Sequence, residues 1–263
     1  MDDYFLFNDL IEYKLLSGLN YDDLNNKKKS EKYNNRINTW FKFLNLCKTN
    51  KKNLVIFING PSNSGKSSWS IELAKRLNIK NVIQTDTIRN NIRKLRNNNK
   101  NSIIHKSSYK CWEQYTKSYS KKSQIKGFES QSRIIAPYIN QLILESCNNG
   151  QFAIIEGIHL VPWIINKQKF KSTFFLEFYF HIENKNLASK RLIKRTETNY
   201  LNRSPDKYLP YLESFNDLSE YLYSNSKRNK SCTIVNNTFA DKALAKIFNN
   251  IFSNINKIIK DYK

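Results

Sequence analysis

The stretch NLVIFINGPSNSGKSS, residues 53–68, joins a short apolar run to a glycine-containing loop. Residues 53–59 are almost continuously apolar, which is typical of a β-strand that is buried on both faces. Residues 60–67 fit the pattern G-x-x-x-x-G-K-[ST], in which backbone N–H groups and the start of the next helix surround phosphate oxygens. The stretch therefore predicts a phosphate-binding loop between a buried strand and a helix.

The polar positions of this loop have expected roles in binding a nucleotide. Lys66 is expected to reach the β- and γ-phosphates, and the Ser67 hydroxyl is expected to bind Mg²⁺. A chance loop is the alternative, but the chain contains only six glycines and two of them stand at the required positions. The residues expected to bind ATP are Gly60, Ser62, Asn63, Ser64, Gly65, Lys66, Ser67 and Ser68.

Strand-like and helix-like segments alternate along the rest of the chain. We expect strands at residues 53–59, 82–85, 152–155, 174–180 and 232–235. We expect helices at residues 66–77, 109–120, 131–147, 187–195, 210–224 and from 240 to the C-terminus. This alternation predicts a three-layer α/β fold, in which a parallel sheet is flanked by helices on both faces.

The first 49 residues have a different pattern from the remainder. Apolar residues at helical spacing predict two helices there, and the polar segment at residues 25–35 between them is expected to be a loop or a frayed helix. We therefore expect an N-terminal helical appendage at residues 1–49 and a phosphate-binding α/β domain at residues 50–263.

Three charged residues are candidates for catalysis beside the loop. Asp86 follows the second expected strand, where it can orient or deprotonate an acceptor hydroxyl, or can simply cap a helix. Arg89 can hold an anionic acceptor or can face solvent. Glu156 ends an apolar strand, as does the acidic residue that holds Mg²⁺ directly or through water in many nucleotide-binding enzymes. We expect Ser67 and Glu156 to form the metal site.

Further candidates come from later segments. A predicted helix after the fourth strand carries basic residues, which can form a closing lid over the transferring phosphoryl group or an ordinary basic surface. His159 can contact substrate or be a buried structural histidine, and Asn236 and Asn237 can contact adenine. The basic residues of this expected lid are Lys190, Arg191, Lys194, Arg195 and Arg203. The expected catalytic residues are Lys66, Asp86, Glu156 and Arg195.

The net charge of the chain indicates which partners it can bind, and its cysteines indicate its cellular location. Forty-four Lys and Arg residues face 22 Asp and Glu residues, which gives a net charge of +22. This excess favours anionic partners such as nucleic acid, acidic headgroups or a polyphosphorylated small molecule, although a solvated basic surface is the simpler interpretation. We expect no membrane insertion because no apolar stretch is long enough. The four cysteines form no CxxC pair, so we expect reduced thiols and a cytoplasmic location.

Several blocks of the sequence together resemble the archaeal-type 2-phosphoglycerate kinase family of P-loop kinases. The blocks are INGPSNSGKSS, QTDTIR, HKSSYKCWEQY, IKGFESQS and IIEGIHLVP, in the family's order between residues 53 and 165. The resemblance implies that ATP and Mg²⁺ are used and that the acceptor is a phosphorylated small acid with a hydroxyl group. Trp163 departs from the family, which tends to have a small residue there. The resemblance points at Asp86, Arg89 and Glu156 near the acceptor. Five further residues lie in matching blocks: His105, Ser107, Ser108, Tyr109 and His159.

Substrate contacts are thus expected from Asp86, Arg89, His105, Tyr109, His159, Arg191 and Arg203. The leading hypothesis is an ATP- and Mg²⁺-dependent small-molecule kinase whose acceptor is similar to 2-phosphoglycerate. Plant relatives of the family look connected to inositol phosphate metabolism, and the basic composition also suits an inositol polyphosphate. Two hypotheses from other classes stay open: a polynucleotide 5′-hydroxyl kinase or nucleic-acid-associated P-loop NTPase, and a nucleotide-binding protein without activity.

Overall fold

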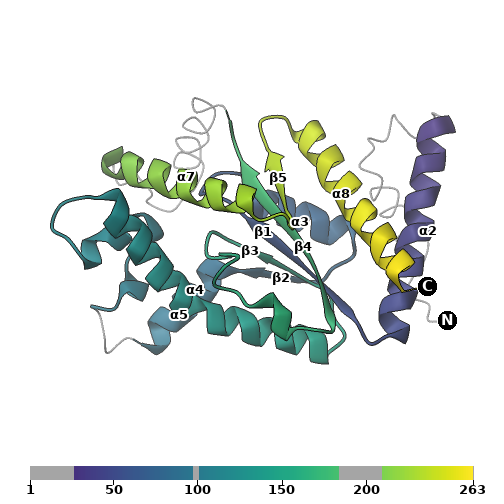
Figure 1. Cartoon of the computed structure of the whole chain (residues 1–263), viewed down its shortest axis with the longest axis horizontal. Helices are drawn as coiled ribbons and strands as arrows, with labels where there is room; N and C mark the ends of the chain where they lie inside the picture. Colours follow the sequence, from purple (N-terminus) through teal and green to yellow (C-terminus); the bar gives the residue numbers. More distant parts are fainter. Residues whose placement is uncertain (1–26, 97–100, 184–208, 263) are drawn as a thin grey trace.

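A five-stranded parallel sheet forms the centre of the computed structural model, which describes residues 27–96, 101–183 and 209–262. The strands lie in the order β2-β3-β1-β4-β5 (Figure 1). Their bounds are β1 Asn53–Asn59, β2 Asn81–Gln84, β3 Ala153–Glu156, β4 Thr173–His181 and β5 Cys232–Asn236. Because every pair is parallel, the carboxyl ends of all the strands meet at one edge of the sheet.

Helices cover both faces of this sheet, so the predicted three-layer α/β fold is confirmed. Leu54, Ile56 and Ile58 of β1 belong to the core cluster that also contains residues of α3 and α8. Val55 and Phe57 point to the opposite face and join the cluster that contains residues of α4 and α5. Alternate burial on two faces explains why the strand reads as a continuous apolar run. The helix bounds are α2 Lys27–Thr49, α3 Lys66–Arg76, α4 Thr85–Leu95, α5 Lys121–Asn148, α7 Leu212–Arg228 and α8 Ala240–Asp261.

The helix α5 is longer than the sequence predicts, because it begins at Lys121 rather than near residue 131. The Ser120 side chain caps it by accepting a hydrogen bond from the Ser123 N–H at 3.2 Å. Gly127 lies inside the helix, where it lets the helix approach the preceding segment: an added Cβ would lie 2.4 Å from the Cys111 carbonyl oxygen. Pro137 also lies inside the helix, on its exposed side. The close packing at Gly127 thus explains a glycine that resembles a loop residue in the sequence.

Three other predicted elements differ from the structure or fall outside it. The predicted helix at residues 109–120 is wrong, since this segment forms the short 3-10 helix η4, Ser108–Gln114, which follows η3, Ile103–His105. The strand β2 ends at Gln84, one residue earlier than expected, because Thr85 already begins α4. The helix predicted at residues 187–195 lies outside the described residues. Two further 3-10 helices are η5, Lys167–Lys169, and η7, Leu209–Tyr211.

The N-terminal helix α2 packs beside α8 at one end of the sheet (Figure 1). Trp40, Phe43 and Cys47 of α2 are buried in the same core cluster as β1 and α8. The polar segment predicted as a loop or frayed helix is helical from Lys27 onward. The division of the chain at residue 49 stays a prediction.

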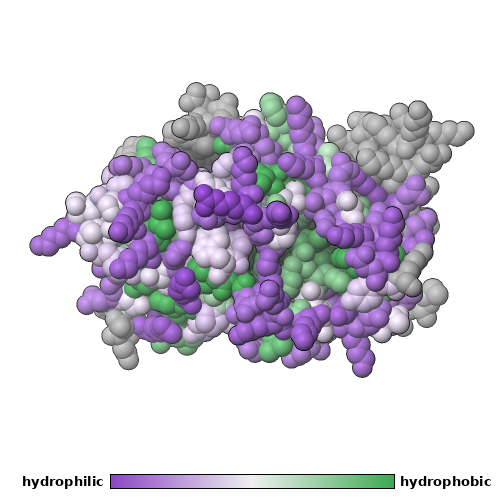
Figure 2. Space-filling model, in the orientation of Figure 1, coloured by the Kyte–Doolittle hydropathy of each residue, from purple (hydrophilic) through white to green (hydrophobic). Residues whose placement is uncertain are grey.

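The surface is largely hydrophilic on the face shown in Figure 2, with apolar residues gathered in scattered patches. This agrees with the high Lys and Arg content of the sequence. Within the described ranges, none of the helices combines the length and the apolar character that crossing a membrane requires.

Candidate active site

The loop after β1 turns into α3 through a glycine in the left-handed region. Gly65 precedes the first residue of α3 and has φ 89°. A Cβ at this position would lie 2.3 Å from the Asn237 amide nitrogen, so both the backbone angle and the close approach require glycine. Asn63 also has a positive φ of 64°, a conformation that asparagine tolerates better than most residues. Together these residues bend the loop around the N-terminus of α3, as the sequence pattern predicts.

Two buried asparagines hold the loop in place. The Asn59 side chain accepts a hydrogen bond from the Gly60 N–H at 2.6 Å and donates one to the Leu160 carbonyl at 2.6 Å. The Asn237 side chain donates to the Ser64 carbonyl at 2.8 Å and accepts from the Trp69 indole N–H at 2.9 Å. The amide of Asn237 therefore supports the loop through both its oxygen and its nitrogen, and its predicted contact with adenine stays a prediction.

A cavity of about 660 Å³ opens beside the loop and the start of α3. The Lys66 ammonium lies over the loop, where it donates a hydrogen bond to the Pro61 carbonyl at 2.7 Å. Ser67 and Ser68 are exposed, whereas Ser64 is buried. The residues that line the cavity are Asn63, Gly65, Lys66, Ser67, Ser68, Trp69, Glu72, Asn237 and Ala240. Most of the expected ATP-binding positions therefore face or border one open space.

The predicted metal pair is brought together by the pairing of β1 with β3. Ile58 lies opposite Glu156 in the parallel register, so Glu156 ends β3 beside the start of the loop. The Ser67 hydroxyl donates a hydrogen bond to the Glu156 carboxylate at 2.7 Å, although the two residues are 89 positions apart. Both groups offer oxygen atoms, the ligands that Mg²⁺ prefers. The described residues contain no group of three or more His, Cys, Asp or Glu that could hold a metal ion. This pair thus suits Mg²⁺ that takes its remaining ligands from phosphates and water.

Asp86 and Arg89 lie one turn apart on α4, at the same edge of the sheet. Asp86 is the second residue of the helix and not its N-cap, which is Gln84, so the capping role considered for Asp86 is wrong. Its side chain is 67% exposed and lies 3.9 Å from the guanidinium of Arg89. Arg89 also donates a hydrogen bond to the Lys106 carbonyl at 3.3 Å. Arg89 is therefore held between α4 and the segment that follows η3, rather than facing freely into solvent.

His159 is completely buried behind this pair. Burial lowers the pKa of its imidazole from 6.5 to about 3, and the Arg89 and Lys66 charges act in the same direction against the opposing effect of Asp86. Its ring stacks on Phe128 with centroids 5.5 Å apart. The side chain thus faces the protein interior. This placement supports the hypothesis of a buried structural histidine rather than that of a substrate contact.

The other expected substrate residues lie in the 3-10 segments. His105 ends η3, and its Nε2 atom is buried without a hydrogen-bond partner in the described part of the chain. Tyr109, in η4, stacks on Phe215 of α7 with centroids 4.4 Å apart and lies 5.4 Å from the Tyr211 ring. The structure thus places Tyr109 in an aromatic cluster between η4 and α7. The basic residues of the expected lid, Lys190, Arg191, Lys194, Arg195 and Arg203, lie outside the described residues.

A second cavity, of about 690 Å³, lies where α2 and α5 end and β2 and β3 begin. Lysines 48, 51, 52 and 80 line it together with an apolar floor that includes Phe152. Lysines near helix C-termini are favoured by the negative end of the helix dipole and by the free carbonyls there. The Lys52 ammonium, for example, donates to the Lys171 carbonyl at 2.9 Å. Lys48, in the last turn of α2, and Lys52 thus have a structural explanation that requires no ligand.

The strand order, the loop between β1 and α3 and the Ser67–Glu156 pair are those of a P-loop kinase fold. No family model matches the chain. A protein named 2-phosphoglycerate kinase from Pyrococcus furiosus is 32% identical over 207 residues, which cover 79% of this chain and 67% of that protein. A protein of the same name from Pyrococcus horikoshii is 30% identical over 207 residues with the same coverage. One from Methanopyrus kandleri is 27% identical over 210 residues, 80% of this chain and 64% of that protein.

The chain belongs to the 2-phosphoglycerate kinase family, as the sequence blocks predicted. The hypothesis of a nucleotide-binding protein without activity is therefore set aside in favour of an enzyme.

Proposed function

We propose that this protein transfers the γ-phosphoryl group of ATP, with Mg²⁺, to a hydroxyl group of a phosphorylated small acid similar to 2-phosphoglycerate. The observation that carries the proposal is the 2.7 Å hydrogen bond between Ser67 and Glu156, beside the phosphate-binding loop. It joins the two oxygen donors that a Mg²⁺–ATP complex requires, and the names of the relatives support the class of acceptor.

On the nucleotide side, the loop N–H groups and Lys66 hold the phosphates. The Lys66 ammonium exchanges its hydrogen bond with the Pro61 carbonyl for contacts with the β- and γ-phosphates. The other expected ATP contacts, Gly60, Ser62, Asn63, Ser64 and Ser68, belong to the same loop. Mg²⁺ would be held by Ser67 and by Glu156, directly or through water, and it would neutralise charge on the phosphates.

On the acceptor side, Asp86 orients the hydroxyl and takes its proton. The hydroxyl oxygen forms a bond to the γ-phosphorus while the bond from that phosphorus to the β–γ bridging oxygen breaks, which leaves ADP. Arg89 binds the phosphate that the acceptor already carries. The Nε atoms of Arg89 and Arg93, and the Nε2 atom of His105, are buried without hydrogen-bond partners among the described residues. Buried polar atoms without partners are costly, and an anionic acceptor would satisfy the two arginine donors among them.

The roles of the lid arginines are proposed on the sequence alone, whereas those of Tyr109 and His159 follow from their packing. Arg195 would neutralise charge on the transferring phosphoryl group, and Arg191 and Arg203 would assist in binding the acceptor. Tyr109 and His159 would shape the acceptor side rather than contact the reacting atoms. The four cysteines are free thiols, which supports a cytoplasmic location.

The test is ADP formation from ATP and Mg²⁺ with a panel of acceptors: 2-phosphoglycerate, 3-phosphoglycerate, inositol phosphates and a 5′-hydroxyl oligonucleotide. We expect turnover with 2-phosphoglycerate that exceeds turnover with the other acceptors. Saturable turnover with an inositol phosphate or with the oligonucleotide instead would replace the acceptor named here. If the protein binds ATP but shows no turnover with any of these acceptors, the proposal that it phosphorylates a small acid of this class would be contradicted.

A further inference from the structure

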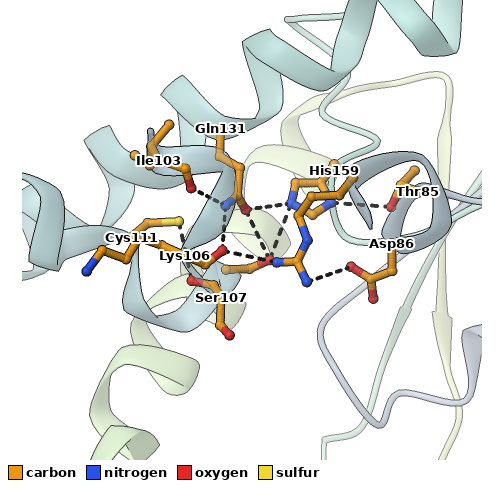
Figure 3. A network of polar contacts seen from close by, with 10 residues as sticks. Thr85, Asp86, Ile103, Lys106, Ser107, Cys111, Gln131 and His159 are labelled. Atoms are coloured by element: carbon orange, nitrogen blue, oxygen red, sulfur yellow. Dashed lines mark hydrogen bonds and ion pairs between the residues drawn. The ribbon is translucent and has the colours of Figure 1, made fainter. Parts of the chain in front are cut away.

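A buried network of polar side chains joins separate segments of the chain next to Asp86 (Figure 3). The His159 ring, which follows β3, lies 3.3 Å from the Thr85 hydroxyl through Nδ1 and 2.9 Å from the Gln131 side-chain oxygen through Nε2. The Ser108 hydroxyl lies 3.3 Å from His159 Nε2 and from the Gln131 oxygen. His159, Thr85 and Gln131 are each completely buried. The network therefore connects β3, α4 and α5 without access to solvent at these three side chains.

The hydrogen bonds of Gln131 determine which ring nitrogen of His159 carries the hydrogen. The Gln131 amide nitrogen donates to the carbonyls of Ile103 and Lys106, each at 2.9 Å. Its oxygen consequently faces His159 Nε2 and can only accept, so Nε2 must donate. A neutral imidazole has one donor and one acceptor, and Nδ1 therefore accepts from the Thr85 hydroxyl. Burial, which lowers the pKa of His159 to about 3, keeps this neutral form.

Each end of the network supports one of the two acceptor-side residues. Thr85 is the first residue of α4 and directly precedes Asp86, so its hydrogen bond to His159 orients the start of that helix. Lys106 accepts hydrogen bonds on its carbonyl from both Gln131 and Arg89. Gln131 thus fixes the carbonyl that positions the Arg89 guanidinium. The two arms diverge at His159, with the Nδ1 side leading to Asp86 and the Nε2 side leading to Arg89.

We propose that His159 is a positioning residue that sets Asp86 through Thr85 and sets Arg89 through Gln131 and the Lys106 carbonyl. The inference rests on the proposed function for the roles of Asp86 and Arg89. It assigns different kinetic consequences to the two arms. Loss of the Thr85 arm misplaces the group that orients the hydroxyl and lowers kcat. Loss of the Gln131 arm misplaces the group that binds the acceptor phosphate and raises the KM for the acceptor.

Two substitutions of His159 separate the arms because each keeps one polar atom near its original place. In His159→Asn the amide oxygen can replace Nδ1 and accept from Thr85, but nothing reaches Gln131. In His159→Gln the amide nitrogen can replace Nε2 and donate to Gln131, but the bond to Thr85 is lost. We expect His159→Asn to raise the acceptor KM about tenfold with kcat close to that of the unmodified enzyme. We expect His159→Gln to lower kcat about tenfold with little change in acceptor KM.

Thr85→Val is the matched control, because it removes the hydroxyl and keeps the shape of the side chain. It should reproduce the kcat of His159→Gln, and the double variant should lose no more than either single variant. The KM for ATP should stay unchanged in all variants. If His159 has only a structural role, the variants will lower thermal stability and the active fraction while kcat per active site and both KM values stay the same. That result, or the same kinetic change in both His159 variants, would overturn the proposal.

Nuclear magnetic resonance provides a readout that does not depend on the acceptor. We expect the ¹⁵N signals of His159 to show the neutral Nε2–H form from pH 5 to 8. We also expect the Arg89 Nε–H signal to shift in His159→Asn but not in Thr85→Val. Failure of every acceptor in the panel, with these signals as expected, would contradict the proposed function and leave the network assignment standing. An Nδ1–H form, or an unchanged Arg89 signal in His159→Asn, would overturn the network assignment itself.

Discussion

The proposed nucleotide side and the proposed acceptor side of this site are constructed differently. The nucleotide side comes mostly from one segment, residues 59–68, whose turn is set by local backbone geometry, and distant residues such as Glu156 and Asn237 add single contacts to it. The acceptor side is assembled from α4, the 3-10 segments, α5 and the loop after β3, and these are joined by buried side-chain hydrogen bonds. From this comparison we expect that substitutions of residues that do not contact substrate will affect activity mainly when they lie on the acceptor side.

The largest expected effect is on the nucleotide side. Lys66→Ala removes the cation proposed to neutralise the transferring phosphoryl group, and we expect kcat to fall about 10³-fold. Steady-state kinetics with saturating ATP would measure this change. Lys75→Ala, an exposed position on the same helix, is the matched control and should leave kcat unaltered. An equal loss in both variants would point to a general effect of charge and would remove the distinction between the loop and the rest of α3.

Gly157 and Thr85 are in contact where the two sides meet, and a substitution there should mainly change the free energy of unfolding. Gly157 has φ 146°, and a Cβ there would lie 1.8 Å from the Thr85 hydroxyl oxygen. We expect Gly157→Ala to lower the free energy of unfolding by about 3 kcal/mol, through backbone strain and the clash with Thr85. Gly150→Ala is the control, because it has φ 61° but no atom within 4 Å of the added Cβ. Its cost should be about 1 kcal/mol.

Chemical denaturation of the two glycine variants would measure the difference between them. Equal losses of stability would show that the contact between Gly157 and Thr85 does not link the sides in the folded protein.

The metal pair tests whether β3 serves the nucleotide side. Glu156→Gln keeps an oxygen near Ser67 but removes the charge, so we expect activity to require about 10- to 100-fold more Mg²⁺. A titration of activity with Mg²⁺ at fixed ATP would measure the midpoint. Glu145→Gln, on the exposed side of α5, should keep the midpoint of the unmodified enzyme. An unchanged midpoint in Glu156→Gln would move the metal site away from the end of β3.

The most gradual expected effect is the dependence of the free energy of unfolding on pH that arises from His159. Its pKa of about 3 in the folded protein lies below the ordinary value of 6.5, so below pH 6.5 the unfolded chain binds a proton that the folded chain does not. This contribution to stability is present above pH 6.5 and is lost as the pH falls towards 3. The slope is about 1.4 kcal/mol per pH unit.

The charged residues around position 159 are the same in the unmodified protein and in His159→Gln. Asp86, Arg89 and Lys66 are the groups whose charges act on His159, and they remain in His159→Gln. As the pH falls from 6.5, the free energy of unfolding of the unmodified protein should therefore decrease relative to that of His159→Gln. Denaturation of both proteins at matched pH would measure this difference. A constant gap from pH 7 to pH 4 would show that His159 does not carry the pH dependence.

Sequence patterns predicted the α/β class, the five strands and the loop because each is encoded locally. A continuous apolar run followed by G-x-x-x-x-G-K-S specifies a buried strand, a phosphate-binding turn and a helix start within about 16 residues. Glu156 was recognisable for the same reason, as an acid at the end of an apolar strand. The start of α5 was missed because Gly127 resembles a loop residue until the close approach of Cys111 is known.

The supports of the site carried no comparable signal. Asn59 and Asn237 hold the loop through contacts with residues 101 and 173 positions away. Gln131 was not singled out from the sequence, because a glutamine in a helix usually faces solvent. Family resemblance marked the block that contains His159, but it did not distinguish a substrate contact from a buried positioning role.

The sequence by itself determined that this chain folds around a parallel sheet and carries a phosphate-binding loop, because hydrophobic periodicity and glycine conformation act over a few neighbouring residues. Only the tertiary structure decided that Ser67 meets Glu156, that Arg89 is held by the Lys106 carbonyl, and that His159 is buried and neutral. Those facts depend on strand register and on how α4, α5 and the 3-10 segments pack together. Desolvation and hydrogen-bond geometry arise from that packing, and no local pattern of residues reports them.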